Sequence, residues 1–270
     1  MFTYEFIGYF VSVLIGVSLG LIGGGGSILA VPMLTYLFMI EEKSATAYSL
    51  FIVGSTALVG GLQKLLKGKV HLPTIAYFGI PAVVGISLMR FFVVPNIPTH
   101  LFSIGDFEVT RRLLMLGLFA FLMIPAAMFM LKKDKAVSDD SIALNTTNRF
   151  LMIIQGLLVG GITGLVGAGG GFLIIPAIMA LAKLDMKTAV STSLIIVMLN
   201  SFSGFFIGDA FRQSIDWNFL FKITGLALIG IFVGMGLGNY IDGKKLKKGF
   251  GYFIVAMAAF IFYMEIFVKH

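Results

Sequence analysis

The sequence predicts an all-α polytopic membrane protein made of two inverted repeats. Three observations predict this fold class: a hydrophobic composition, an internal repeat, and an uneven distribution of basic residues between loops. Of the 270 residues, 58% are hydrophobic and 12% are charged, whereas about 25% of residues in a soluble domain are charged. Several apolar runs reach the ~20 residues that a helix needs to cross a bilayer. Little of the chain is therefore left for a soluble domain.

One sequence pattern occurs twice, at Gly20–Pro32 and at Gly164–Pro176. In each copy a run of small residues interrupts an apolar segment, which then restarts at once. The copies are 144 residues apart, and the match continues without a gap for about forty residues. The same offset pairs Lys43 with Lys187, Ser49 with Ser193 and Gly60 with Gly204. We conclude that the chain is an internal duplication.

The first repeat is predicted to cover residues 1–131. An apolar segment at 6–22 ends in the first glycine run, and a shorter segment follows at 27–40. Helices are expected at 45–65, 73–92 and 111–131, with a loop of turn-forming residues between the last two. Each repeat thus has a Gly-broken helical hairpin followed by three spanning helices.

The most polar stretch of the chain, residues 132–148, is predicted to be a linker. The second repeat, 149–270, follows the plan of the first. Its segments are expected at 149–166, 171–183, 188–208, 217–240 and 248–267.

Loop charges distinguish two arrangements of the repeats. If each glycine break reverses the chain as a hairpin, re-entrant or fully spanning, the halves are inverted, and 13 of the 20 basic residues lie on one face. If each break merely interrupts one spanning helix, the halves are parallel and the basic residues divide 10 and 10. Basic loops stay in the cytoplasm, so the charges favour inverted halves, a cytoplasmic linker and both termini outside.

Several function classes are excluded by composition. The chain has no cysteine, which rules out disulfides and thiol catalysis. Its histidines, His71, His100 and His270, are not spaced as metal ligands, and no nucleophile–base pair is evident. No basic face with interleaved aromatic residues accompanies the net charge of +7. We expect no metal, no cofactor, no nucleic-acid partner and no enzymatic activity.

The glycine breaks are the first candidate site. A helix that begins within the membrane has backbone N–H groups without an intrahelical partner, and such N–H groups with the helix dipole bind anions. The alternative is that the glycines only allow close helix packing. Two matched copies favour a binding site. The residues expected to contribute are Gly25, Gly26 and Ser27 in the first copy and Gly169, Gly170 and Gly171 in the second.

The helix after each break carries small polar residues. The repeat offset pairs Tyr48 with Thr192 and Thr56 with Asn200, so both halves offer polar groups at equivalent positions. Most Ser and Thr hydroxyls in lipid bond to their own helix. Asn200 is different, because its own helix turn does not easily satisfy its amide. We expect these four side chains to close the substrate site.

Nearly all charged residues fall at predicted helix ends or in loops, and none is required to lie at mid-membrane. A proton-driven carrier usually has an intramembrane carboxylate. Transport is therefore expected to work without such a relay, with any coupling ion, H⁺ or Na⁺, held by neutral oxygens.

The two Gly-rich breaks, each followed by a proline and a helix with small polar residues, resemble the TauE/SafE family of membrane permeases, the sulfite exporter family. The resemblance covers essentially the whole chain in length, duplication and spacing. The two copies differ where Gly24 is replaced by Ala168 and Ser27 by Gly171. The family's motif residues fall on Gly23, Gly25, Gly26 and Pro32, and on Gly167, Gly169, Gly170 and Pro176.

The resemblance implies a carrier in a bacterial-type inner membrane for sulfite, organosulfonates or related anions. Together with the glycine breaks and the polar residues described above, the resemblance predicts a permease that binds a small anion between the two breaks near the membrane midplane. A structural or assembly membrane protein is the alternative. The expected partners are the anion and the lipid bilayer, and the sequence leaves a homodimer open.

Overall fold

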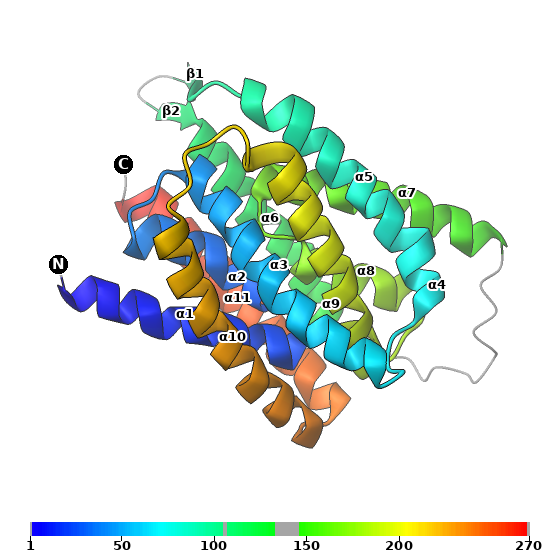
Figure 1. Cartoon of the computed structure of the whole chain (residues 1–270). Coiled ribbons are helices and arrows are strands. Elements are labelled where there is room, and N and C mark those ends of the chain that lie inside the picture. The colour runs from blue at the N-terminus through cyan, green and yellow to red at the C-terminus, as the bar shows by residue number, and fades with distance from the viewer. Residues whose placement is uncertain (1, 105–106, 133–145, 269–270) are drawn as a thin grey trace.

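The computed structural model describes residues 2–104, 107–132 and 146–268, which form a helical bundle (Figure 1). Most of the predicted linker, residues 133–145, lies outside the described residues, as does His270. In the described part, seven helices are long and apolar enough to cross a membrane. The predicted all-α membrane architecture is therefore confirmed.

The first half of the chain begins with a helix, a glycine break and a short second helix. Ser12 of α1 donates to the Met33 sulfur (3.5 Å), and the rings of Tyr9 and Phe38 lie 6.0 Å apart. Because residues further back along α1 contact residues further along the chain, the chain reverses direction at the break. The elements are α1 (Phe2–Ile22), α2 (Gly26–Pro32) with a π-helical continuation η1 (Met33–Leu37), α3 (Glu42–Leu66), α4 (Leu72–Thr74), η2 (Ile75–Gly79), α5 (Ile80–Leu88), η3 (Met89–Val93), η4 (Val94–Asn96) and α6 (Arg111–Leu131).

The loop before α6 differs from the expectation. It contains a two-stranded antiparallel hairpin, β1 (His100–Ile104) and β2 (Phe107–Thr110). Both strands are rich in Phe, Ile, Val and Thr, which favour extended backbone.

The second half repeats the order of the first. Its elements are α7 (Thr146–Val166), α8 (Gly171–Leu181), α9 (Met186–Ser203), η5 (Gly204–Asp209), α10 (Trp217–Tyr240), α11 (Gly243–Tyr263) and η6 (Met264–Val268). At 1.5 Å per residue, the 11 residues of α8 extend only about 16 Å, roughly half the hydrocarbon thickness of a bilayer.

The two halves pack against each other reciprocally. Helix α1 lies on α10, and its counterpart α7 lies on α5. In detail, Gly230 meets the backbone of Val13, and Gly85 meets the backbone of Leu157, which is 144 residues after Val13. Helices α3 and α9 pack together and form the centre of the bundle, since 72% and 67% of their apolar windows are buried, against 39–44% for the other spans.

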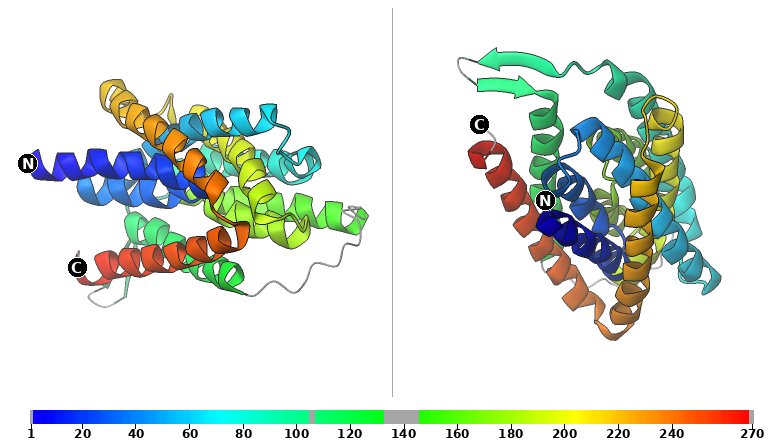
Figure 2. Two further views of the ribbon diagram at one scale, coloured as in Figure 1. Left: turned by 90° about the horizontal axis from the view of Figure 1, so that it is seen from below. Right: turned by 60° about the vertical axis from the view of Figure 1, so that its left-hand side comes forward.

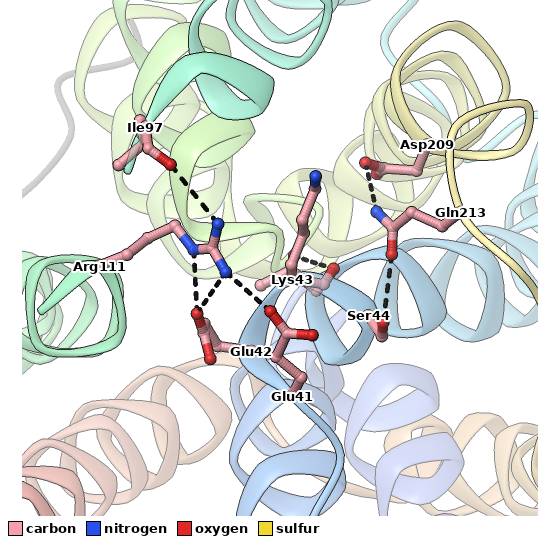
Figure 3. Close-up of polar contacts among 9 residues, drawn as sticks. Glu41, Glu42, Lys43, Ser44, Ile97, Arg111, Asp209 and Gln213 are labelled. Atoms are coloured by element: carbon pink, nitrogen blue, oxygen red, sulfur yellow. Dashed lines mark hydrogen bonds and ion pairs between the residues drawn. The ribbon is translucent and has the colours of Figure 1, made fainter. Parts of the chain in front are cut away.

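Charged residues gather at the two ends of the bundle. At the end that carries β1 and β2, called here the hairpin end, Arg111 pairs with Glu41 and Glu42 at 2.8 Å (Figure 3). Both described ends of the chain also lie toward the hairpin end (Figure 2). At the opposite end, the lysine end, helices α3 and α6 finish and α9 and α11 begin. The lysine end carries Lys64, Lys67, Lys69, Lys132, Lys187, Lys244, Lys245 and Lys247.

Candidate functional site

The two glycine breaks touch each other in the interior. The backbones of Gly24 and Gly171 are so close that a Cβ on either would overlap the other. An anion therefore does not fit between these two residues in this conformation, and any anion bound at the breaks lies beside this contact.

Each break is seated on the central helix of the other half. Gly23 lies against Val190 and Ser193 of α9. Its counterpart Gly167 lies against Thr46 of α3, and its carbonyl accepts a hydrogen bond from Ser49. Gly23 and Gly167 both have φ of +73°, a conformation that glycine adopts without the cost paid by other residues. The sharp chain reversal therefore requires glycine at these two positions.

The breaks contain backbone donors without backbone acceptors. Among the described residues, no backbone carbonyl accepts from the N–H groups of Gly25, Gly26, Gly169 or Gly171. The Ser27 hydroxyl donates to the carbonyl of Gly24 (2.7 Å). Gly170, in the left-handed conformation, is the N-cap of α8. The unpaired N–H groups of the four glycines are the donors available to an anion at the breaks.

Two of the four predicted side chains bond to loop residues, although their sequence neighbours Ser49 and Ser193 contact the breaks. The Tyr48 hydroxyl accepts from the backbone N–H of Asp216 (2.8 Å) and lines a cavity of about 340 Å³ at the hairpin end. The Thr192 hydroxyl accepts from the backbone N–H of His71 (3.0 Å), near the start of α9 at the lysine end. The two hydroxyl groups thus lie toward opposite ends of the bundle, because α3 begins at the hairpin end and α9 begins at the lysine end.

The other two predicted side chains are buried in the central helices. Thr56 donates to the carbonyl of Ile52 in its own helix (2.6 Å). Asn200 is fully buried, and neither atom of its amide has a hydrogen-bond partner among the described residues. Its neighbour Ser201 is also buried without a partner, and its hydroxyl lies against Gly169. An unpaired buried amide is costly, so α9 has unsatisfied hydrogen-bonding capacity at Asn200 and, beside Gly169, at Ser201.

Sequence reasoning missed a buried ion pair next to the second break. Arg90 and Asp209 lie within two of the apolar spans, are 0% and 3% exposed, and pair at 2.8 Å between Nη1 and Oδ2. The Arg90 Nη2 atom lies against Gly167. Nearly all charged residues are expected at helix ends or in loops, and Arg90 is a buried exception within an apolar span. The sequence contains a signal for this residue, since Arg90 is the only Asp, Glu, Lys or Arg between Lys69 and Asp106.

Asp209 is also connected to the hairpin end. Gln213 donates to Asp209 (3.2 Å), and Ser44 donates to Gln213 (3.2 Å), as Figure 3 shows. This chain of hydrogen bonds joins the loop after η5 to the start of α3. Within the described part of the chain, no group of three His, Asp or Glu side chains could hold a metal ion.

Comparison with known proteins gives a consistent result. The family model described as sulfite exporter TauE/SafE matches residues 9–261. A probable membrane transporter protein of Xylella fastidiosa (strain 9a5c) is 28% identical, covering 92% of this chain and 91% of the relative. The probable membrane transporter protein YdhB of Bacillus subtilis is 26% identical over 87% of this chain and 91% of its own length. No solved structure matches the chain.

Proposed function

Because the chain belongs to the sulfite exporter TauE/SafE family, as a multi-pass membrane transporter, we propose that it carries sulfite or another small sulfur-containing anion such as an organosulfonate. The anion binds beside the contact between the two glycine breaks. Gly25, Gly26 and Ser27 face it from one half, and Gly169, Gly170 and Gly171 from the other.

One observation carries this proposal: two successive residues of α9 have buried polar groups without a partner among the described residues, and one of them, Ser201, lies against the second break. Asn200 and Ser201 have no partner among the described residues, and native proteins leave few buried polar atoms unpaired. A small oxyanion accepts several hydrogen bonds at once and would satisfy such donors together with the free backbone N–H groups. Close helix packing explains glycines such as Gly85 and Gly230, but it does not explain an unpaired Asn200.

The remaining predicted side chains receive separate roles in the proposal. Thr56 is the counterpart of Asn200 in the first half. Tyr48 and Thr192 lie at the two ends of the bundle, so we assign them to the entrances, where each would meet the anion at a different stage of transport.

The arrangement of the halves supports an alternating-access carrier built from inverted repeats. Helix α3 runs from the hairpin end to the lysine end, whereas its counterpart α9 runs from the lysine end to the hairpin end. We propose that the lysine end, with the 132–148 linker, faces the cytoplasm of a bacterial-type cell, since basic loops are retained there. Both termini would then lie outside.

Transport is tested with the purified full chain in liposomes loaded with radiolabelled sulfite. Release faster than from protein-free liposomes, and competition by unlabelled sulfite, are expected. Chloride-loaded vesicles control for leakage. Equal sulfite release with and without the protein would contradict the proposed function.

A further inference from the structure

We infer that Arg90 is the charged ligand of an oxyanion subsite at the second glycine break, and that Asp209 is the counter-ion of Arg90 while no anion is bound. This inference rests on the proposed function, because it identifies a residue that would hold the transported anion.

The guanidinium of Arg90 has hydrogen-bonding capacity to spare. Its Nη1 donates to Asp209, but among the described residues neither Nε nor Nη2 has a partner, although the side chain is fully buried. The Nη2 atom lies against Gly167, at the start of the break whose free N–H groups precede α8. A planar guanidinium presents its donors as a fork that matches two oxygens of one oxyanion. The geometry therefore brings a fixed positive charge and backbone donors to one place.

The first break has no such charge. Gly85 and Gly230 make equivalent contacts with Leu157 and Val13, so α5 and α10 correspond with an offset of 145 residues. This offset makes Met235, which is buried, the counterpart of Arg90. The fold thus accepts an uncharged side chain at this position in one half. A buried arginine in the other half is costly to desolvate, and a role in binding accounts for its presence.

Asp209 is placed to exchange with the anion. Its Oδ2 atom faces Arg90, while its Oδ1 atom accepts from Gln213. When an oxyanion reaches Arg90, it replaces one negative oxygen by another, and Asp209 keeps the hydrogen bond from Gln213. The empty site therefore never leaves Arg90 without a counter-ion, and the carboxylate competes with the substrate.

The inference is tested by calorimetric titration of the purified full chain with sodium sulfite at an ionic strength held constant with chloride. Arg90→Met reproduces the residue of the other half and should weaken sulfite affinity at least about tenfold, the loss expected for one hydrogen bond to a charged group. Asp209→Asn removes the competing charge and should tighten sulfite affinity. Arg212→Gln is the matched control, because the exposed Arg212 side chain contacts only the carbonyl and ring of Phe91 among the described residues. The sulfite affinity of this variant should stay within about twofold of wild type.

A folding defect is separated from a binding defect with the double variant Arg90→Met/Asp209→Asn. It leaves no unpaired buried charge, and its thermal unfolding is measured beside its sulfite affinity. A folded double variant with weakened binding supports the inference. A folded double variant with wild-type affinity overturns the inference and leaves the proposed function standing, whereas a wild type that binds no sulfite overturns both.

Discussion

At the scale of single residues, Asn200 connects the sequence with the site most directly. An amide in an apolar helix is hard to satisfy within its own turn, and this property singles it out from the sequence. In the structure both amide atoms are buried, and neither has a partner in the part of the chain that is described. The serines and threonines around it mostly follow the ordinary pattern, since Thr56 and Ser193 bond to their own helices.

Replacing Asn200 with alanine removes no hydrogen bond seen within the protein, so the thermal stability of Asn200→Ala should match or exceed that of wild type. Sulfite binding should weaken by ~1.5–3 kcal/mol, the range for a hydrogen bond to a charged group. Titration and thermal unfolding of the purified protein measure the two effects. Thr224→Ala is the control, because Thr224 is buried and its hydroxyl donates to the Leu220 carbonyl of its own helix. Unchanged sulfite affinity in Asn200→Ala would remove Asn200 from the site.

The pairing of Arg90 with Asp209 could not be read from the sequence. The two residues are 119 positions apart, and the counterpart of Arg90 in the other half is the uncharged Met235, so neither spacing nor the repeat predicts the pair. Only the packing of η3 against η5 brings the two residues together. A buried charge in a membrane protein is a sign of function. In the sequence, a single arginine within an apolar run indicates such a charge.

The loop before α4 offers a test through pH. Burial lowers the pKa of His71 below its usual value, because the folded chain favours the neutral ring. Stability is then unaffected above a pH of about 6.5, the ordinary histidine value, and falls as the pH drops below it. We expect this acid-side loss of thermal stability to shrink in His71→Gln. An identical pH profile for the variant would contradict the assignment.

At the scale of elements, apolar runs predict most helices closely. The expected segments 111–131 and 217–240 coincide with α6 and α10, and 45–65 lies within α3. The apolar runs do not show where the chain reverses its direction. At the first break, only the contacts of α1 with α2 and η1 establish the hairpin.

Gly167 combines a positive φ with a crowded site, so its replacement tests whether the break requires glycine. Gly167→Ala puts a Cβ on a residue with positive φ and into contact with Arg90 and Thr46, so it should cost at least ~1–2 kcal/mol of stability. Gly117→Ala is the control, since nothing lies near a Cβ there, and it should gain up to ~1 kcal/mol in helix α6. Thermal unfolding in detergent compares them, and equal melting temperatures would contradict the strain argument.

Valine at Gly26 or Gly170 is a less informative change. A Cβ at Gly26 overlaps the Ile15 carbonyl, and one at Gly170 overlaps Thr163. Either variant would therefore disturb the packing of the breaks whether or not an anion binds there.

At the scale of the whole molecule, the charge asymmetry between loops predicts the orientation, and the absence of cysteine makes it testable. Single cysteines at Lys67 and Lys245, both exposed at the lysine end, should stay unlabelled by a membrane-impermeant thiol reagent in intact cells. Cysteines at Thr99 and Phe211, both exposed at the hairpin end, should react. The opposite labelling pattern would reverse the orientation, and reaction at both ends would refute the topology.

The internal counter-ion of Arg90 has a consequence for energetics. With Asp209 in place, the buried pair carries no net charge, so an empty carrier can change conformation without moving this charge through the membrane's electric field. A loaded carrier moves the negative charge of its substrate, and each charge crossing 100 mV is worth about 2.3 kcal/mol. An interior-negative voltage would then suffice to drive the anion outward with no second ion. Sulfite efflux from vesicles should accelerate when a potassium gradient with valinomycin makes the lumen negative. An efflux rate that does not depend on the voltage would show that the charge of the anion is balanced in another way.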